Sequence, residues 1–260
     1  MKPALARVLL TGASGGIGQA MVSALRGVGA QVLGVSRTHL VDASGLRWVQ
    51  ADLTQAEGVS RVARAARDWN ANVVVHAAGL PGFGALEALA PAQMQAVLQA
   101  NLLAPMLLTQ ALLPQLLAQP RAQIVFVGSA LGRIGLPGFS LYTASKAGLH
   151  GFAEALRREL ADSPVRVQLL APRSTRTNFN DATAEAYNRA TGTASDSADE
   201  VARALLALIE SEAAERYMGW PERLGVRLNG ACPPLLDGSF KKHRRQLALA
   251  QTPATKGVAP

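Results

Sequence analysis

The residues best suited to chemistry are Tyr142 and Lys146, which are four positions apart in the run Tyr142-Thr143-Ala144-Ser145-Lys146. On a helix, two residues with this spacing share one face. In water a phenol titrates near ~10 and a lysine near ~10.4. A nearby ammonium favours the phenolate, so we expect it to lower the tyrosine pKa. Such a pair can donate and accept a proton near neutral pH; an ordinary surface contact is the alternative.

The sequence after Lys146 predicts the helix that positions this pair. Apolar residues recur there at helical spacing, namely Ala147, Leu149, Phe152, Ala153, Leu156 and Leu160. This is the pattern of an amphipathic helix. We therefore expect Tyr142 and Lys146 to lie at its beginning.

A glycine-rich segment follows the first predicted strand, residues 6–10, and its sequence is Thr11-Gly12-Ala13-Ser14-Gly15-Gly16-Ile17-Gly18. The apolar residues after it have helical period, so the order is strand, glycine turn, helix. Glycines let the backbone approach a pyrophosphate, and a helix N-terminus attracts its negative charge. We expect a dinucleotide to contact Gly12, Ser14, Gly16, Ile17 and Gly18, although a tight turn would also use glycines.

The turn after the second predicted strand, residues 31–35, indicates which dinucleotide binds. Dinucleotide folds often place an acid here to hold the ribose 2′-hydroxyl, whereas this chain has Ser36-Arg37-Thr38. No carboxylate repels a 2′-phosphate at this point, and Arg37 can bind one through charge-assisted hydrogen bonds. We therefore expect NADP(H), with contacts to Ser36 and Arg37; an exposed loop arginine is the alternative.

Two further strand ends carry candidate cofactor contacts. Residues 48–53 predict a strand with a polar end, where Asp52 and Leu53 would lie near the adenine; alternatively Asp52 caps the next helix. Residues 73–75 predict a buried strand that ends in His76-Ala77-Ala78-Gly79. Ala77, Ala78 and Gly79 are small enough to let the chain pass close to a cofactor ribose. We expect His76 to be a structural hydrogen-bonding residue.

Asn101 and Ser129 are polar residues in apolar surroundings. Asn101 interrupts a long apolar helical stretch, residues 91–117, where it either bonds to the backbone or holds a water in a proton path. Ser129 follows the strand predicted at residues 123–127, at the carboxyl end where ligands of open parallel sheets bind. A serine in that place is also a common turn former.

The remaining pattern completes the fold prediction. Residues 165–170 predict a strand, 199–209 a helix and 216–218 a last strand. The polar, alanine-rich segment around 178–198 predicts a mobile lid over a substrate cleft, or a poorly ordered insertion. Successive strand–helix units without linkers predict an α/β fold, namely one Rossmann-type, doubly wound parallel sheet of about seven strands.

Together these residues resemble the short-chain dehydrogenase/reductase family over roughly residues 5–220. The motifs occur in the family's order: Thr11-Gly12-x-x-x-Gly16-x-Gly18, Asp52, His76-Ala77-Ala78-Gly79, Asn101, Ser129 and Tyr142-x-x-x-Lys146. Two residues depart from the family pattern, because His76 replaces the usual asparagine and Arg173 replaces the glycine after Pro172. An arginine disfavours positive φ, so we expect the turn at Arg173 to be built differently.

The resemblance implies a role for each candidate residue. Tyr142 would be the general acid in carbonyl reduction, and Ser129 would hydrogen-bond the same oxygen. Lys146 would bind the nicotinamide ribose and lower the pKa of Tyr142, and Asn101 would position the water that links Lys146 to solvent. The family also implies dimers or tetramers and further cofactor contacts at Pro172, Thr175 and Thr177.

Composition limits the alternatives. The single cysteine, Cys232, excludes an internal disulfide and a cysteine-based metal site, and the four histidines show no ligand spacing, so no metal is expected. The N-terminal apolar run is too short for a signal peptide or a spanning helix, so we expect a cytoplasmic protein. Basic residues are not interleaved with aromatic stacking partners, so nucleic acid is not an expected partner.

The net charge of +8 is concentrated near the C-terminus. Five basic residues and no acid follow Asp237, and leucines accompany them within 235–250. We expect residues 1–230 to form the domain and 231–260 to form a basic amphipathic extension. Such a segment can lie on an anionic membrane, here the inner face. A solvated tail or a helix packed on a partner subunit are the alternatives.

These observations lead to one functional hypothesis and two alternatives. We expect NADPH-dependent reduction of a small, lipophilic carbonyl compound, such as a ketone, an aldehyde or a β-ketoacyl group, to an alcohol. Leu131, Arg133 and Phe139 would form the substrate wall together with the lid. The same chemistry run backwards is an NADP-dependent alcohol dehydrogenase. A non-catalytic nucleotide-binding or lipid-surface scaffold is the alternative from another class.

Overall fold

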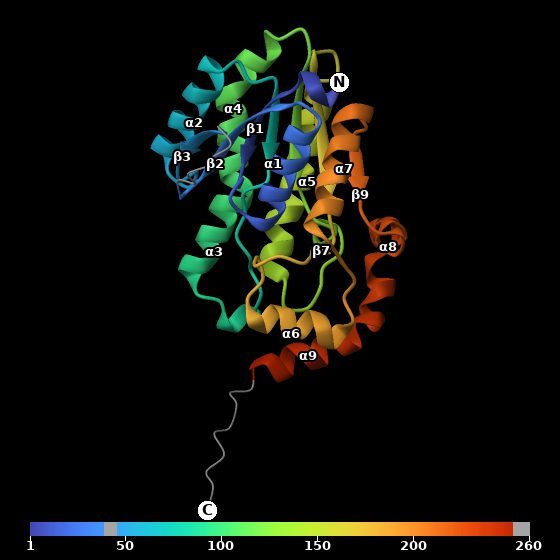
Figure 1. The fold of residues 1–260 in the computed structure, drawn as a ribbon. Coiled ribbons are helices and arrows are strands. Elements are labelled where there is room, and N and C mark those ends of the chain that lie inside the picture. Colours follow the sequence, from blue (N-terminus) through green and yellow to red (C-terminus); the bar gives the residue numbers. More distant parts are fainter. Residues whose placement is uncertain (39–45, 252–260) are drawn as a thin grey trace, which may run out of the picture.

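The computed structural model describes residues 1–38 and 46–251 as one α/β domain. Its centre is a parallel sheet of seven strands in the order β3-β2-β1-β4-β5-β6-β9 (Figure 1). The strands are β1 (Arg7–Thr11), β2 (Gln31–Ser36), β3 (Arg47–Gln50), β4 (Val73–His76), β5 (Ala122–Val127), β6 (Val165–Ala171) and β9 (Glu215–Tyr217). The predicted doubly wound sheet is confirmed.

The strand order reverses between β1 and β4. The chain builds β2 and β3 on one side of β1 and then crosses to β4 on the other side. In such sheets a ligand binds at the carboxyl ends of the strands beside this reversal. The glycine-rich loop after β1 and the segment that starts with Ala77 after β4 lie at these two strand ends.

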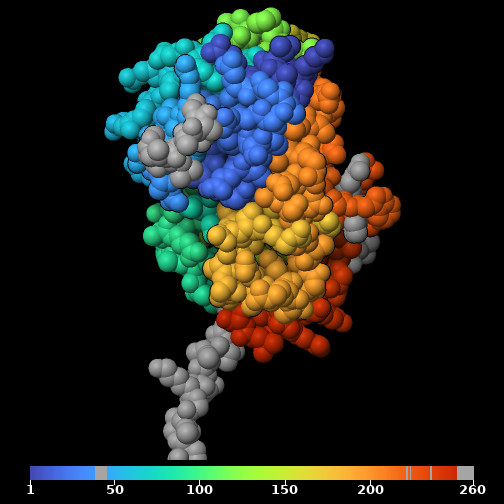
Figure 2. Space-filling view, viewed as in Figure 1, coloured from blue at the N-terminus to red at the C-terminus, as the bar shows by residue number. Residues whose placement is uncertain are grey.

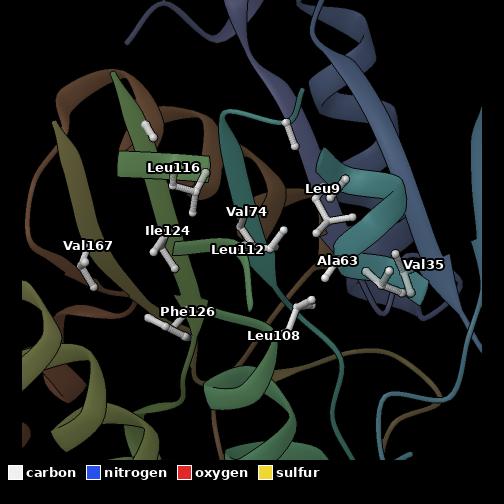
Figure 3. Packing of buried hydrophobic residues seen from close by; sticks show 14 of the residues in the cluster. Leu9, Val35, Ala63, Val74, Leu108, Leu112, Leu116, Ile124, Phe126 and Val167 are labelled. Atoms are coloured by element: carbon white, nitrogen blue, oxygen red, sulfur yellow. The ribbon is translucent and has the colours of Figure 1, made fainter. Parts of the chain in front are cut away.

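Helices cover both faces of the sheet, as the full burial of β4 and β5 requires. One face packs against α2 (Ala56–Asp68), α4 (Ala104–Leu117) and α5 (Ser140–Glu159), and the other against α1 (Gly16–Gly27) and α7 (Ala198–Ser211). Figure 3 shows the first of these cores, in which Leu9 and Val74 of the sheet lie near Leu108 and Leu112 of α4. Short helical turns complete the framework at η1 (Pro3–Leu5), η2 (Leu86–Ala88) and η4 (Ala130–Gly132).

The long helix predicted at 91–117 is divided into three parts. They are α3 (Pro91–Leu98), a π-helical turn η3 (Gln99–Leu103) and α4. Such turns insert an extra residue into a helix and occur often at functional sites, and here the turn carries Asn101. By length and composition this stretch could also span a membrane. However, Leu108, Leu112 and Leu116 of α4 are buried against the sheet, so α4 is a core helix.

The lid segment is more regular than the sequence predicts. It contains α6 (Ala182–Thr191), and its end, β8 (Ser195–Asp196), pairs in parallel with β7 (Ser174–Thr175). The Asp181 side chain caps α6 by accepting a hydrogen bond from the Ala184 backbone N–H at 2.7 Å. Ala184 and Tyr187 then bury one side of the helix. The segment therefore holds a capped helix with two buried side chains, and its role as a mobile lid stays a prediction.

The C-terminal extension folds back onto the lid. It follows α8 (Trp220–Ala231) and consists of η5 (Pro233–Phe240) and α9 (Lys241–Gln251). Helix α9 packs against α6, and Figure 2 shows it (red) along the lower edge of the lid (yellow to orange). Leu247 points toward Gly138, and the Lys242 Nζ donates to the Thr191 carbonyl at 3.1 Å. The end of the predicted extension, 252–260, lies outside the described residues.

Candidate active site

Tyr142 and Lys146 lie in the first turns of α5, as predicted. Lys146 is buried, and its Nζ donates a hydrogen bond of 3.0 Å to the carbonyl of Val127, the last residue of β5. The same Nζ lies 5.8 Å from the centre of the Tyr142 ring. The pair is therefore anchored to the carboxyl end of a central strand, which excludes the alternative of a loose surface contact.

Ser129 comes two residues after the end of β5 and is buried beside this pair. Its Oγ accepts a hydrogen bond from the Leu131 N–H at 3.1 Å, which caps the short turn η4. The Ser129 side chain also lies close enough to the Tyr142 phenol to lower its pKa. Tyr142, Ser129 and Lys146 thus form one cluster, although they come from two separate segments of the chain.

The protonation of this cluster differs from the sequence-based expectation. Burial raises the pKa of Tyr142 to about 12, and only the neighbouring Ser129 side chain opposes this shift. Burial also lowers the pKa of Lys146 to about 8. The expectation that Lys146 lowers the tyrosine pKa is wrong for this state, because the ammonium bonds to a backbone carbonyl and desolvation dominates. Tyr142 is therefore a protonated phenol at neutral pH, as a proton donor must be.

Asn101 is fully buried and joins three segments around the cluster. Its Oδ1 accepts from the Leu80 N–H at 2.7 Å, and its Nδ2 donates to the Leu80 carbonyl at 3.0 Å and to the Ser145 Oγ at 3.1 Å. A Cβ at Gly79 would lie 3.1 Å from Oδ1 and 3.8 Å from the Lys146 Nζ. The expected backbone partners are confirmed, while the water-holding role stays a prediction.

The glycine loop packs tightly against the segment after β4. Gly12 has φ +70°, and a Cβ there would lie 2.7 Å from backbone atoms of Ala78. The Thr11 Oγ1 accepts hydrogen bonds from the N–H groups of Ala77 and Ala78 at 3.1 and 3.2 Å. Only a glycine combines this φ with this close approach. The glycine loop after β1 and the segment after β4, both predicted to contact the cofactor, are therefore held against each other.

The N-terminus of α1 is left open for an anion. Gly15, the residue before the helix, has no side chain to cap it, and no acidic residue lies in the first turn. The first amides of a helix have no partner within it, and they attract a negative group. Gly16 is exposed here, and a Cβ on it would lie 2.7 Å from the Thr177 Cγ2. This cradle fits a pyrophosphate, and Thr177 lies at its rim.

The other residues predicted in the loop have different surroundings. The Ser14 carbonyl accepts from the Gln19 Nε2 at 2.9 Å. Ile17 packs against the core beneath the loop, and Gly18 is buried, with its Cβ position only 2.1 Å from the Gly12 carbonyl. Ile17 and Gly18 therefore shape the loop from below.

The end of β2 carries Ser36 and Arg37 as predicted. Ser36 is buried and donates a hydrogen bond to the Thr38 carbonyl, while Arg37 is exposed. The Arg37 carbonyl accepts from the Gln50 Nε2 at 2.9 Å. These bonds hold the backbone of the turn and leave the guanidinium at the surface.

Asp52 makes a local turn. Its Oδ1 accepts from the Thr54 N–H at 2.9 Å and the Thr54 Oγ1 at 2.8 Å. These bonds, helped by the Arg37 charge, lower its pKa. Helix α2 begins after Gln55 without any side-chain cap, so the helix-cap alternative for Asp52 is wrong. Asp52 is exposed and Leu53 is half-buried against the core, so Asp52 is the more accessible of the two to an adenine.

The turn at Arg173 is built without positive φ, as expected. The Pro172 carbonyl accepts from the Ala130 N–H at 2.9 Å, which ties this turn to the one that carries Ser129. The Thr175 Oγ1 donates to the Arg173 carbonyl at 3.2 Å. The Arg173 guanidinium contacts Asp196 of the lid, 2.8 Å away. Arg173, which stands where the family pattern has a glycine, thus holds this turn through an ion pair.

His76 is a structural residue, as predicted. It is buried, its Nε2 lies 2.9 Å from the Thr109 Oγ1, and its ring stacks on Phe126 with 5.0 Å between centroids. Burial lowers its pKa to about 3. The imidazole is therefore neutral and fully engaged.

The predicted substrate wall is only partly assembled at the cluster. Phe139 is buried with Phe83 and Tyr187, at 5.0 and 5.8 Å between ring centroids. Arg133 is exposed and paired with Glu154 at 3.0 Å, while Leu131 is half-buried. Phe179, which the sequence did not single out, has its ring 6.1 Å from that of Tyr142. The sequence did offer one signal for Phe179, because it follows the predicted cofactor contact Thr177 by only two residues.

Comparison with known proteins identifies similar chains. A family model described as short chain dehydrogenase matches residues 6–188. An uncharacterized oxidoreductase of Escherichia coli, YbbO, is 34% identical over 181 residues, which are 67% of each chain. A 3-ketodihydrosphingosine reductase of Bacteroides thetaiotaomicron is 29% identical over 223 residues, covering 85% of this chain and 81% of that one. The crystal structure of a short chain dehydrogenase from Burkholderia cenocepacia in complex with NADP has a TM-score of 0.82 at 28% identity, covering 93% of this chain and 99% of that one.

Proposed function

The chain belongs to the short chain dehydrogenase family, and from this we propose that it reduces the carbonyl group of a lipophilic substrate with NADPH. The observation that carries the proposal is the cluster of Tyr142, Ser129 and Lys146 at the carboxyl end of β5. The glycine loop and the open N-terminus of α1 lie at the same edge of the sheet, where the strands have their carboxyl ends. A proton donor and a dinucleotide cradle on one edge are what carbonyl reduction needs.

The chain binds NADP(H), the cofactor present in the structural neighbour from Burkholderia cenocepacia. In the proposed arrangement Gly12, Ser14, Gly16 and Ile17 receive the phosphates, with Gly18 beneath them. Arg37 and Ser36 take the 2′-phosphate. Asp52 and Leu53 lie toward the adenine, and the nicotinamide end is held by Ala77, Ala78, Gly79, Tyr142, Lys146, Pro172, Thr175 and Thr177. When bound, the cofactor supplies a hydride to the carbonyl carbon.

The protein side chains supply the proton and hold the substrate oxygen. Tyr142, a phenol with its pKa raised by burial, is protonated and donates its proton to that oxygen. Ser129 donates a second hydrogen bond and stabilises the negative charge that develops there. Lys146 then assists reprotonation of Tyr142, with Asn101 placed to hold the water that connects it to solvent.

A lipophilic substrate is supported by the aromatic side chains beside the cluster. Phe179 lies against the Tyr142 ring, and Phe139 packs with Tyr187 of the lid helix. A relative that covers 85% of this chain is, by its name, a 3-ketodihydrosphingosine reductase. We therefore place the substrate among apolar ketones, aldehydes and β-ketoacyl compounds.

The exposed basic residues of α9 support the further proposal of a cytoplasmic enzyme that touches an anionic membrane at its inner face. Lys241, Lys242, Arg244 and Arg245 are exposed, and Leu249 is 66% exposed beside them. Each basic residue near such a surface adds about 1 kcal/mol. Vesicle sedimentation at low salt tests this, comparing Lys241→Glu/Arg245→Glu with equal charge reversal at Arg64 and Arg203. If both variants sediment alike, α9 does not bind the membrane.

We also propose a homodimer or homotetramer, as the resemblance to the family implies. Leu98 and Leu103 on the helical segment that contains Asn101 are 39% and 41% exposed. A second copy would cover these apolar side chains. Light scattering coupled to size-exclusion chromatography measures the mass directly, and a monomeric mass contradicts the proposal.

A carbonyl panel tests the activity itself. The purified protein is mixed with NADPH and with ketones, aldehydes and β-ketoacyl thioesters of increasing chain length, and NADPH consumption is followed. The expected result is turnover that rises with chain length and is lost in Tyr142→Phe. Turnover only in the reverse direction, with NADP⁺ and alcohols, would favour the dehydrogenase alternative. Binding of NADPH without turnover of any substrate would favour the scaffold.

A further inference from the structure

Helix α5 presents a third polar side chain in line with Tyr142 and Lys146. His150 is four residues after Lys146, so all three lie along one face of the helix. Each reaches the end of β5 or the turn that follows it. The Lys146 Nζ donates to the Val127 carbonyl at 3.0 Å, and the Ser129 N–H points to the His150 Nε2 at 3.5 Å. Tyr142 lies beside the Ser129 side chain, which lowers the pKa of the phenol.

We propose that His150 is a positioning residue, whose neutral imidazole fixes the turn that carries Ser129 in register with Tyr142. This proposal rests on the proposed function, because it assigns Ser129 to the reaction. The His150 Nε2 contacts the backbone N–H of Ser129, whereas the reaction is assigned to the Ser129 side chain. His150 acts from behind the turn, through the backbone.

The packing around the imidazole supports this role. A Cβ on Gly128 would lie 2.4 Å from the His150 Nε2, and a Cβ on Gly132 would lie 2.8 Å from it. Neither glycine has positive φ. The two glycines are therefore required by the ring, not by their own backbone conformation. The imidazole fills the space between the residues on either side of Ser129, and it is only 1% exposed.

The second ring nitrogen identifies the tautomer. Because Nε2 accepts from the Ser129 N–H, Nδ1 carries the hydrogen. Burial, with the Arg133 and Lys146 charges, keeps the ring neutral by lowering its pKa to about 3. Nδ1 and the Gln168 Oε1 are buried without a partner among the described residues, and both residues line one cavity of about 10 Å³.

A cavity of this size accommodates about one water molecule. In the proposed arrangement, a water there would accept from the His150 Nδ1–H and donate to the Gln168 Oε1. Gln168 is itself held, because its Nε2 donates to the Leu208 and Ala213 carbonyls at 2.8 and 2.9 Å. The Ser129 N–H therefore selects the Nδ1–H tautomer, and Gln168 offers a fixed acceptor on the other side of the ring.

Two substitutions of His150 distinguish the effect of its hydrogen-bond acceptor from the effect of its side-chain volume. His150→Gln keeps an acceptor at the reach of Nε2, whereas His150→Leu fills the site without one. We expect His150→Leu to lower kcat roughly 10²-fold, the effect of a small misplacement of a catalytic group, with the KM for NADPH unchanged. His150→Gln restores most of kcat. Equal losses in the two variants, or wild-type kcat in His150→Leu, would overturn the proposal.

A double-mutant cycle tests the contact from the other side. Gly132→Ala lowers kcat because its Cβ meets the ring, and the loss shrinks when His150→Ala removes the ring. Gly135→Ala is the matched control in the same loop, since a Cβ there meets nothing within 4 Å. If Gly132→Ala costs the same in both backgrounds, the ring does not hold the turn.

A spectroscopic measurement keeps this proposal separate from the proposed function. The ¹⁵N chemical shifts of His150 in the wild-type protein report which nitrogen carries the hydrogen, whether or not any carbonyl is reduced. We expect the Nδ1–H tautomer, and an Nε2–H or charged ring contradicts the proposal. Failure of every carbonyl to react, with the Nδ1–H tautomer present, would count against the proposed function alone.

Discussion

Arg173 contacts one carboxylate oxygen of Asp196 through two nitrogens, with Nε 2.9 Å and Nη2 2.8 Å from Oδ1. Its third nitrogen, Nη1, lies 3.4 Å from the Glu222 Oε1. Asp196 closes the lid segment and Glu222 is on α8. One arginine therefore joins the turn after β6, the lid and the C-terminal part of the chain.

Replacing Arg173 should loosen all three segments together. Arg173→Ala leaves the buried Asp196 carboxylate without its partner, and we expect a loss of about 2–3 kcal/mol in the free energy of unfolding. This is somewhat less than for a fully buried pair, because Arg173 is 24% exposed. Urea denaturation measures it. The surface pair of Arg189 and Glu185 is the control, and Arg189→Ala should cost under about 0.5 kcal/mol.

Tyr142→Phe should remove the proton donor while keeping the ring that packs against Phe179. General acid catalysis contributes roughly 10²–10⁴-fold, so kcat should fall by that factor. Binding of NADPH, measured by its fluorescence, should change little. A variant that retains wild-type kcat would show that another group supplies the proton.

Arg37→Ala should change cofactor preference. A hydrogen bond to a charged group contributes about 1.5–3 kcal/mol, so the KM for NADPH should rise roughly 10- to 100-fold while that for NADH stays nearly constant. Arg64→Ala, an exposed arginine on α2, serves as the control. Equal changes for the two cofactors would remove Arg37 from the site.

Glu212 should make stability depend on pH in the acid range. Burial alone would raise its pKa, but Arg121, 2.6 Å away, and the terminal ammonium outweigh burial and lower the pKa to about 2. A carboxylate with a depressed folded pKa stabilises the protein above its unfolded pKa and loses this effect as pH falls. We expect about 1–2 kcal/mol to disappear between about pH 5 and pH 2.

The variant Glu212→Gln tests this assignment. Its free energy of unfolding should be lower than that of the wild type near neutral pH and should approach it near about pH 2. Glu210 is an exposed acid on α7, two residues before Glu212, and Glu210→Gln is the control. Its free energy of unfolding should have the same pH dependence as that of the wild type. Parallel pH profiles of Glu212→Gln and the wild type would exclude Glu212 as the source.

Much of the fold was predictable because local patterns carry it. The apolar run of Val73, Val74 and Val75 predicts a buried strand, and the glycine run after Thr11 predicts the turn into α1. The lid was not predictable in this way. Its helix rests on the buried Tyr187 and on α9, which is distant in sequence, so its own polar composition gave little signal.

In the candidate site too, local sequence predicted some residues and contacts between distant segments determined others. Spacing alone places Tyr142, Lys146 and His150 on one helix face, because the α-helical period is a property of the local backbone. Motif order likewise indicated Ser129, Asn101 and the glycine loop. His150 was nevertheless overlooked, since no local feature shows that its ring reaches the Ser129 turn.

From the sequence alone came the strand order along the chain, the glycine-rich turn and the residues proposed for proton transfer, because each depends on neighbours close in the chain. The tertiary structure decided the raised pKa of Tyr142, the ion pair that Arg173 makes with Asp196, and the contact of His150 with Ser129. These depend on desolvation and on contacts between distant segments, and such quantities exist only once the chain has folded.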